Sequence, residues 1–387
     1  MNFDDINEAG LRRRRGEKWN HYPADVLPAW VADMDFVVAE PIRAALAGRL
    51  EAADLGYPQS HRRTGLPELF AERVAARFDW SIAAADVLIL SDVVQGLYLA
   101  LESYSERGDG VVIQTPIYPP FLHAVAETGR RAVCCDLQPG ATRYEIDFAT
   151  MEAAIDSGCR VFMLCNPHNP SGRAFTADEL GRIADLVCRH DLVLVSDEIH
   201  ADLILAPARH IPVASLSDDI AARTVTLMSA SKAFNIAGLC MAFAHFGSPA
   251  LRRRFERIPA HLRGGTNTLS IAAVEAAWRH GQPWLDEVLA TLRANRDRVA
   301  EFVAARWPAV GHLPPEATYL AWLDLRKLEL EPSPQAWLLE HARVALNEGR
   351  TFGPAGEGHV RLNFATSSAL LETLLERLDG ALSNAHS

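Results

Sequence analysis

Short apolar runs alternate with amphipathic stretches through the middle of the chain, and this alternation predicts an α/β fold. The apolar runs are rich in Val, Ile and Leu, as strands buried on both faces are. They are Val87–Leu90, Val111–Gln114, Arg131–Cys135, Val161–Cys165, Leu192–Ser196 and Thr224–Met228. Helical spacing of apolar residues is found between them, for example in Pro67–Phe78. We therefore expect a largely parallel sheet whose loops gather at one edge.

The pattern of apolar positions changes after about residue 278, which predicts a smaller α+β domain. The elements expected there are a helix over Trp284–Arg306, a strand over Tyr319–Leu323, a helix over Ser333–Leu339, a strand over His359–Ala365 and a helix over 368–383. Alternation in the second strand places Arg361 and Asn363 on one face. We expect an N-terminal arm that joins the small domain over 1–48, a large domain over 49–285 and the small domain over 286–387.

Five loops that follow predicted strands carry candidate functional groups. They contain Val93–Val94, Tyr118, Asn169, Asp197 and Lys232. The strand that ends at Leu90 leads through a short loop into a helix expected from about Gly96, and free backbone N–H groups at such a turn can bind an anion. An acid directly after a buried strand, such as Asp197, needs a cationic or N–H partner. Lys232 lies among small and apolar residues, where a lysine can act as a nucleophile or a base.

Prolines restrict two of these loops. Two Asn-Pro pairs in Asn166–Gly172 favour extended backbone, so Asn169 can present its amide from a rigid loop. Two prolines after Tyr118 fix its backbone, which suits a ring used for stacking. Simpler interpretations are a packed loop aromatic at Tyr118 and a surface lysine at a strand end. Near the N-terminus, Asp33 and Asp35 could form an acid/base pair, but we favour a loop that packs its aromatic residues and solvates its acids.

Composition narrows the possible partners and compartments. The 387 residues include 49 acidic and 38 basic residues, for a formal net charge of −11, which argues against nucleic acid as the main partner. The run Arg12–Arg15 is expected to be a solvated arm. Six cysteines show no metal-binding spacing, so we expect no metal site, and several lie in apolar runs typical of buried thiols. With no signal-peptide pattern and no apolar run long enough for a membrane span, a cytoplasmic protein is expected.

Several segments carry a family resemblance that extends over nearly the whole chain. Asn166–Gly172 (NPHNPSG), Ser196–His200 (SDEIH) and Ser229–Gly238 (SASKAFNIAG) resemble the signature loops of the fold-type I, aspartate-aminotransferase-like enzymes that use pyridoxal 5′-phosphate (PLP). Pro28–Phe36, Gly56–Pro58 and His200–Leu203 resemble more closely the MalY/PatB-type cystathionine β-lyases, which are C–S lyases. The resemblance implies a large domain with a mostly parallel seven-stranded sheet, a smaller α+β C-terminal domain and a homodimer.

The resemblance also implies roles for residues around the cofactor ring. Lys232 would bind PLP covalently, and Asp197 would pair with the ring nitrogen. Tyr118 would stack on the ring, and Asn169 would bond its hydroxyl oxygen. His200 takes a place in the cofactor site where many aminotransferases of this fold have tyrosine.

Further roles concern the phosphate and the substrate. Val93 and Val94, through their backbone N–H groups, and Ser229 would hold the phosphate, with Tyr57 reaching it from the neighbouring subunit. Many relatives place an arginine on the phosphate eight residues after the lysine, where this chain has Cys240. The substrate α-carboxylate would be bound by Arg361 together with Asn169, and Asp33 is a further expected substrate contact.

The branch of the family implies the reaction. We expect β-elimination from L-cystathionine or a related cysteine S-conjugate, giving pyruvate, ammonia and a thiol. An aminotransferase that acts on an amino acid and a 2-oxo acid is the alternative, because the same residues serve both reactions. A third hypothesis, a regulator or binding protein on the same fold, is disfavoured by the full set of ring contacts.

Overall fold

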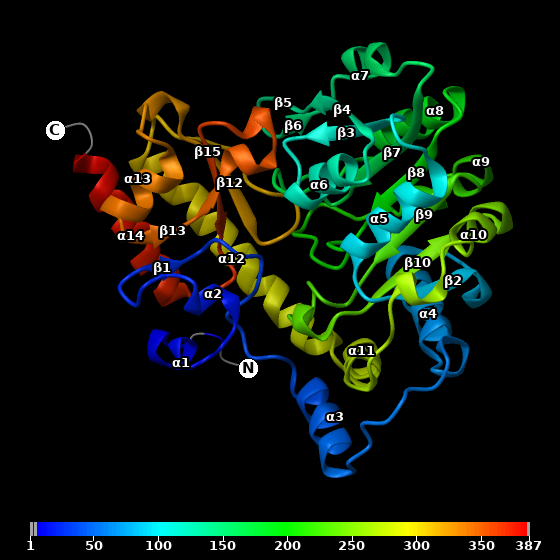
Figure 1. The fold of residues 1–387 in the computed structure, drawn as a ribbon. Coiled ribbons are helices and arrows are strands. Elements are labelled where there is room, and N and C mark those ends of the chain that lie inside the picture. Colours follow the sequence, from blue (N-terminus) through cyan, green and yellow to red (C-terminus); the bar gives the residue numbers. More distant parts are fainter. Residues whose placement is uncertain (1–2, 4–5, 385–387) are drawn as a thin grey trace.

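The computed structural model describes residue 3 and residues 6–384, which form two regions side by side (Figure 1). The cyan-to-green middle of the chain surrounds one large sheet. The orange and red C-terminal part lies on the other side, next to the blue N-terminal segment. The long yellow helix α12 (Gln282–Arg306) runs from one region into the other. The domain bounds proposed from the sequence, 1–48, 49–285 and 286–387, remain predictions.

The large sheet has seven strands in the order β2-β10-β9-β8-β7-β3-β4. Their bounds are β2 (Val87–Leu90), β3 (Gly110–Thr115), β4 (Arg131–Asp136), β7 (Cys159–Cys165), β8 (Val193–Asp197), β9 (Thr224–Met228) and β10 (Ala242–Phe246). Only β10 runs antiparallel to its neighbours, so the expected mostly parallel sheet is confirmed. Cys165 pairs with Asp197, and Asp197 pairs with Leu227. The carboxyl ends of β7, β8 and β9 are therefore level, and their loops leave from one edge.

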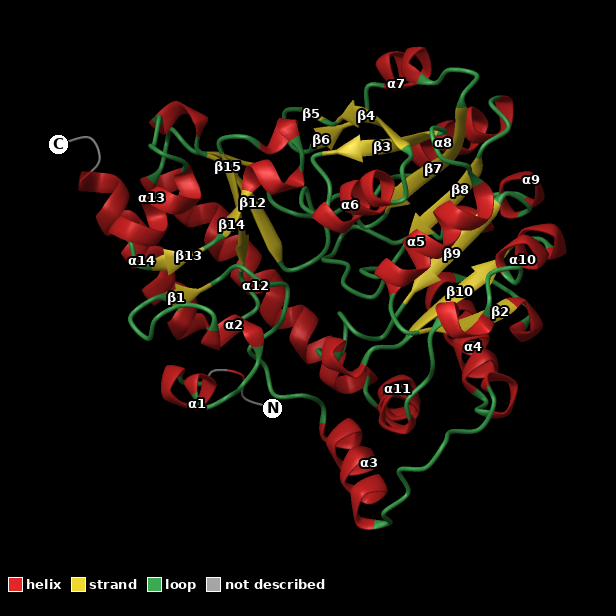
Figure 2. Ribbon diagram, in the orientation of Figure 1, coloured by secondary structure: helices red, strands yellow, loops and turns green. Residues whose placement is uncertain are grey.

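Helices cover both faces of this sheet (Figure 2). They are α4 (Leu66–Phe78), α5 (Val93–Tyr104), α6 (Pro119–Glu127), α7 (Phe148–Ala154), α8 (Ala177–Arg189), α9 (Asp218–Ala221), α10 (Pro249–Phe255) and α11 (Thr268–His280). Helix α3 (Glu40–Glu51) packs against α11 and projects away from the sheet. Val111 of β3 belongs to the apolar cluster with α5, α6 and α10, whereas Val112 belongs to the cluster with α7, α8 and α9. Alternate residues thus enter opposite cores, which explains why the strand is apolar throughout.

Side-chain caps set the start of two helices next to the sheet edge. α5 begins at Val93, three residues before the predicted Gly96, because the Asp92 carboxylate accepts a hydrogen bond from the Gln95 N–H at 2.7 Å. α8 begins at Ala177, where the Thr176–Glu179 capping box is present. Val93 therefore lies in the first turn of a helix and not in the preceding loop.

The second region is built on a four-stranded antiparallel sheet in the order β11-β12-β15-β14. Its elements are β11 (Gly311–His312), β12 (Leu320–Asp324), β14 (Asn347–Glu348), β15 (His359–Asn363), α13 (Pro334–His341) and α14 (Ser368–Asn384). The N-terminal segment, with α1 (Glu8–Arg12) and α2 (Glu17–Asn20), joins it because β1 (Leu27–Pro28) pairs with β13 (Val344–Ala345). β5 (Gln138–Pro139) and β6 (Tyr144–Glu145) form a separate hairpin on the large region.

Short 3-10 helices connect several of these elements. They are η2 (His61–Arg63), η3 (Ala84–Asp86), η4 (Val213–Ser215), η5 (Ala237–Leu239), η6 (Ala260–Arg263), η7 (Arg326–Leu328), η8 (Gly349–Phe352) and η9 (Pro354–Gly356). None of the described helices is both long enough and apolar enough to cross a membrane. Within the same described ranges, no group of three or more His, Cys, Asp or Glu side chains is placed to hold a metal ion.

The expectation of a solvated arm over Arg12–Arg15 was correct only in part. In the Arg12–Arg15 run, Arg13 and Arg15 are exposed, but Arg12 pairs with Glu8 and lies over the Trp19 ring at 5.2 Å. The arm is therefore packed at its first arginine and solvated further along. Of the six cysteines, all free, Cys135, Cys159 and Cys165 are buried, whereas Cys134 and Cys240 are exposed.

A buried ion pair holds the segment between β1 and α3. The Lys18 amine lies 3.0 Å from the Asp35 carboxylate, and both side chains are about 5% exposed or less. The Trp19 indole donates to the same carboxylate oxygen at 2.7 Å, and the Lys18 amine donates to the Asp33 carbonyl at 3.1 Å. Asp35 thus has a structural role and not that of an acid/base pair. The loop interpretation was wrong in one respect, because Asp35 is buried in an ion pair and is not solvated.

We expect Lys18→Met to lower the melting temperature markedly, because it leaves a buried carboxylate without its cation, a change that costs about 3–5 kcal/mol. The control is Arg189→Met, which breaks the half-exposed Arg189–Glu152 pair and should cost about 1 kcal/mol or less. Thermal unfolding of both variants checks this. Equal shifts in melting temperature would contradict the larger contribution to stability that we assign to the buried ion pair.

Candidate active site

Loops that follow five strands of the large sheet meet around one cavity of about 260 Å³. Its lining includes eight residues predicted from the sequence: Val93, Val94, Tyr118, Asn169, Asp197, His200, Ser229 and Lys232. The parallel strand ends explain this meeting, because loops from adjacent parallel strands leave the sheet at the same edge.

Lys232 reaches into this cavity from the loop after β9. Its amine donates to the Ala32 carbonyl at 3.0 Å, and the Tyr319 hydroxyl donates to the same carbonyl at 2.7 Å. Burial lowers the pKa of Lys232, although the nearby Asp33 charge acts in the opposite direction. A lysine with a lowered pKa has more of the neutral amine, the form that acts as a nucleophile or a base.

Asp197 ends β8 and is 4% exposed. Its side chain accepts a hydrogen bond from the Ile199 N–H at 3.0 Å. Burial raises the pKa of Asp197 to about 7, and the Ile199 hydrogen bond only partly offsets this effect. The buried carboxyl group has no ion pair among the described residues, so a cationic ligand group next to it would be stabilised strongly.

Arg361 approaches the cavity wall from β15 of the other sheet. One Nη donates to the Asn169 side-chain oxygen at 3.1 Å, and the other donates to the Trp30 carbonyl at 2.9 Å and to the Asn347 side chain. The guanidinium lies over the Phe352 ring at 5.0 Å. Burial lowers the pKa of Arg361 to about 10. Its Nε has no partner among the described residues and it forms no ion pair with them, which suits the binding of a ligand carboxylate.

The first turn of α5 supplies a place for an anion. Val93 and Val94 line the cavity at the start of the helix, where backbone N–H groups have no intrahelical acceptor. Ser229 also lines the cavity, but its hydroxyl donates to the Met241 carbonyl at 2.6 Å. Its oxygen is therefore a weaker candidate donor than the helix amides.

His200 and Tyr118 occupy other parts of the wall. His200 is buried, its Nδ1 has no partner among the described residues, and burial lowers its pKa to about 3, so the ring is neutral. The Tyr118 backbone N–H donates to the Asn169 carbonyl at 3.0 Å, which ties the two loops together. Burial raises the pKa of the Tyr118 hydroxyl, which therefore stays protonated near neutral pH.

Two other predicted residues lie elsewhere. The Tyr57 side chain is fully exposed and is not part of the cavity wall of its own chain. Asp33 lines an adjoining pocket of about 530 Å³, and its backbone carbonyl accepts from Lys18 and Asn363. Sequence reasoning missed Ala32 and Tyr319, because a backbone carbonyl leaves no mark in the sequence and its bonds to Lys232 and Tyr319 span 200 and 287 positions.

Comparison with known proteins places this chain in a family. The sequence profile described as aminotransferase class I and II matches residues 37–378. The chain belongs to the aminotransferase class I and II family. Cystathionine β-lyase PatB of Bacillus subtilis (strain 168) is 37% identical to it over 389 residues, which cover 99% of this chain and 100% of PatB.

Solved structures of similar proteins agree over the full length. The structure of OvoB has a TM-score of 0.94 with 39% identity and covers 99% of both chains. Cystalysin from Treponema denticola, whose structure contains a PLP cofactor, has a TM-score of 0.94 with 30% identity and covers 99% of this chain and 100% of its own.

In this member of the aminotransferase class I and II family, the anion end of the cavity is short of cationic side chains. Cys240, at φ 52°, lines the wall beside Met241. Among the described residues that line the cavity, Lys232 is the one lysine and there is no arginine. Besides Lys232, the amides and the dipole at the start of α5 are therefore the groups of this wall that favour an anion.

The raised pKa of Asp197 predicts how stability depends on pH in the ligand-free protein. Between the unfolded value of 3.8 and the folded value of about 7, the folded state holds a proton that the unfolded state has lost. The contribution of this group, roughly 4 kcal/mol at most, is present in full below pH 4 and is lost as the pH rises to 7. Melting temperatures of wild type and Asp197→Asn between pH 5 and 8 check this. The wild type should lose stability relative to the variant as pH rises, and a constant difference would contradict the raised pKa.

Proposed function

We propose that this chain is a PLP-dependent C–S β-lyase, which converts L-cystathionine or a related cysteine S-conjugate into pyruvate, ammonia and a thiol. The observation that carries the proposal is one cavity that combines the Lys232 amine with the Asp197 carboxyl group, with Arg361 bonded to Asn169 at its wall. The similarity to PatB, named a cystathionine β-lyase, supports β-elimination as the reaction.

The residues around the cavity fit PLP. The buried Asp197 carboxyl, which has no ion pair within the described part of the chain, suits a protonated ring nitrogen, which would in turn lower the pKa of Asp197 again. The Lys232 amine would bind the cofactor aldehyde, and Tyr118 would lie against the ring. The free amides of Val93 and Val94 would receive the phosphate.

The residues of this chain then have defined tasks. When bound, PLP supplies a sink for the electron pair that stays on the substrate Cα after its proton leaves. Arg361 and Asn169 hold the α-carboxylate, and the Lys232 Nζ takes the Cα proton. Cleavage of the Cβ–S bond releases a thiolate, which takes up a proton to become the thiol. The remaining three-carbon enamine reacts with water to give pyruvate and ammonia.

Transamination is the second candidate, because the family includes aminotransferases and the residues named above serve both reactions. It requires return of a proton to the cofactor and a 2-oxo acid as acceptor. Lys232 would move the proton in either case, so the two reactions are distinguished by their products.

We expect the PLP-loaded protein to release pyruvate, ammonia and homocysteine from L-cystathionine over many turnovers without any added 2-oxo acid. Coupled pyruvate and thiol assays measure this. Lys232→Ala should reduce the rate at least about 10³-fold, since it removes the base and the attachment point, and should lose the absorbance of the lysine-bound cofactor. Turnover that appears only with a 2-oxo acid would assign the chain to the aminotransferases instead.

We further propose a homodimer in which Tyr57 completes the phosphate site of the partner subunit. The full exposure of Tyr57 and the lack of an arginine in the cavity wall of the described chain support this arrangement.

The ligand is a small amino acid, and the net charge of −11 argues against nucleic acid. Six free cysteines are consistent with a reducing compartment, so we propose the cytoplasm.

Subunit mixing tests the role of Tyr57. Tyr57→Ala and Lys232→Ala homodimers should each have little activity. Random reassembly should restore about a quarter of the wild-type activity, because each mixed dimer contains one site with both an intact lysine and an intact tyrosine. If mixing restores nothing while Tyr57→Ala alone is impaired, Tyr57 acts within its own chain.

A further inference from the structure

The loop that carries Asn169 is joined to a distant part of the chain, the segment 314–318 that leads into β12. The Gly172 carbonyl accepts hydrogen bonds from the Glu316 and Ala317 N–H groups, both at 2.9 Å. Gly172 has φ 69°, and a Cβ on it would lie 2.2 Å from the Pro315 Cβ. Only glycine permits this approach, so the two segments are in direct backbone contact.

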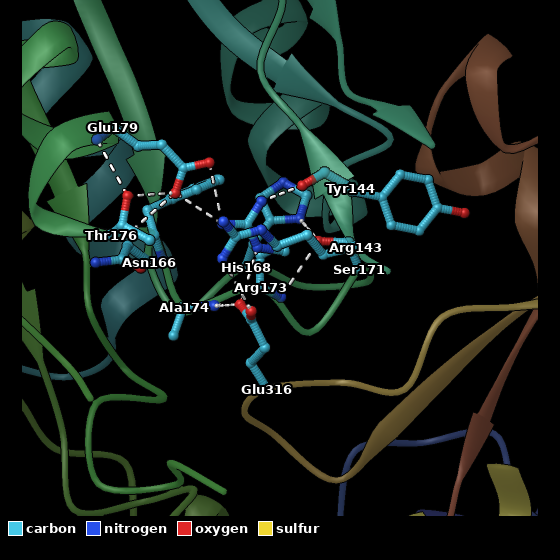
Figure 3. A network of polar contacts seen from close by, with 11 residues as sticks. Arg143, Tyr144, Asn166, His168, Ser171, Arg173, Ala174, Thr176, Glu179 and Glu316 are labelled. Carbon is cyan, nitrogen blue, oxygen red and sulfur yellow. Dashed lines mark hydrogen bonds and ion pairs between the residues drawn. The ribbon is translucent and has the colours of Figure 1, made fainter. Parts of the chain in front are cut away.

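A buried arginine adds side-chain bonds to this junction (Figure 3). Arg173, 1% exposed, donates from Nε to the Glu316 carboxylate at 2.9 Å and from Nη2 to both oxygens of Glu179, at 2.7 and 3.0 Å. Its other Nη donates to the Tyr144 carbonyl. The Glu316 oxygen that receives Nε also accepts from the Ala174 N–H at 3.0 Å. The guanidinium is thus held by three separate parts of the chain.

The junction is connected at both of its ends to the pair that faces the substrate. Asn169 lies in the same loop as Gly172, and its side-chain oxygen accepts a hydrogen bond from Arg361 at 3.1 Å. Arg361 lies on β15, opposite Trp322 of β12, and β12 continues from the segment that carries Glu316. A shift of that segment relative to the loop would therefore change the distance between Asn169 and Arg361.

We propose that Arg173 and Glu316 are positioning residues, which keep Asn169 and Arg361 in register for the α-carboxylate of the substrate. This inference rests on the proposed function, because it assigns the carboxylate site of the same cavity. Neither residue lines the cavity, and Glu316 lines a separate pocket of about 380 Å³. Their effect is therefore transmitted through the loop.

Glu316 is the better residue to change, because Arg173 also serves the helix start at Glu179. Glu316→Ala removes the side-chain bonds to Arg173 and Ala174 and keeps the backbone bonds to Gly172. The 25% exposure of the Glu316 side chain limits the damage to the core. Glu316→Gln keeps an oxygen acceptor and tests rescue. Arg143→Ala is the matched control, because Arg143 lies 3.6 Å from the outer oxygen of Glu316 and is half-exposed.

Binding of L-alanine, which has an α-carboxylate and no leaving group, gives the decisive readout. Its dissociation constant for the PLP-loaded protein is measured from the change in cofactor absorbance. Glu316→Ala should raise this constant about tenfold or more, while Glu316→Gln and Arg143→Ala stay within about threefold of wild type. Ethylamine, which lacks the carboxylate, should bind equally to wild type and Glu316→Ala. Amide hydrogen exchange over residues 166–173 should become faster in Glu316→Ala alone.

An unchanged L-alanine affinity in Glu316→Ala, even with a lowered melting temperature, would overturn the proposal. The junction between the Asn169 loop and segment 314–318 would then be a purely structural feature. Equal weakening of L-alanine and ethylamine would also overturn it, because the carboxylate would not be the group affected. Failure of the proposed lyase function is seen separately, as a wild type that binds L-alanine but releases no pyruvate from L-cystathionine.

Discussion

The level carboxyl ends of β7, β8 and β9 are the constraint on which the site depends. Asp197 is paired on both sides, with Cys165 and with Leu227, so its backbone cannot move outward without breaking the sheet. The carboxyl group is therefore kept in a place where burial disfavours its charge. A flexible loop would relieve this cost by moving the group into water. The sheet prevents this movement, so the Asp197 carboxyl group stays buried and strongly favours a cationic partner next to it.

The N-terminal segment 30–33 connects the two halves of the site. Its backbone carbonyls accept hydrogen bonds from both regions: Trp30 from Arg361, Val31 from Asn363, Ala32 from Lys232 and Tyr319, and Asp33 from Lys18 and Asn363. At the Ala32 carbonyl, Lys232 of the large region and Tyr319 of the second region share one acceptor. The buried Lys18–Asp35 ion pair stabilises the position of this segment. The N-terminal part of the chain therefore contributes to the cavity wall, through Ala32.

The parts of this structure that follow from local patterns could be predicted. Apolar runs marked six of the seven strands, and the position of Asp197 and Lys232 after such runs indicated their shared edge. β10 was not predicted. The sequence pattern placed the start of α5 at about Gly96, whereas the helix begins at Val93. The pattern does not show that the Asp92 carboxylate accepts a hydrogen bond from the Gln95 amide. Contacts made by carbonyls, such as that of Ala32, and pairs far apart in sequence, such as Arg173 with Glu316, depend on tertiary packing alone. For the same reason, the sequence could suggest Tyr57 only through a family resemblance.

The contact between Gly172 and Pro315 has a consequence for the divergence of this sequence. A side chain at position 172 collides with position 315, and any other residue there must also adopt a left-handed backbone. Segment 314–318 cannot compensate by moving away, because Glu316 and Ala317 would then lose their shared acceptor. A substitution at position 172 is therefore tolerated only if segment 314–318 also changes, whereas position 315, whose own Cβ already fits against the glycine, can change alone. In homologous sequences, a residue other than glycine at position 172 should occur only together with an altered segment 314–318.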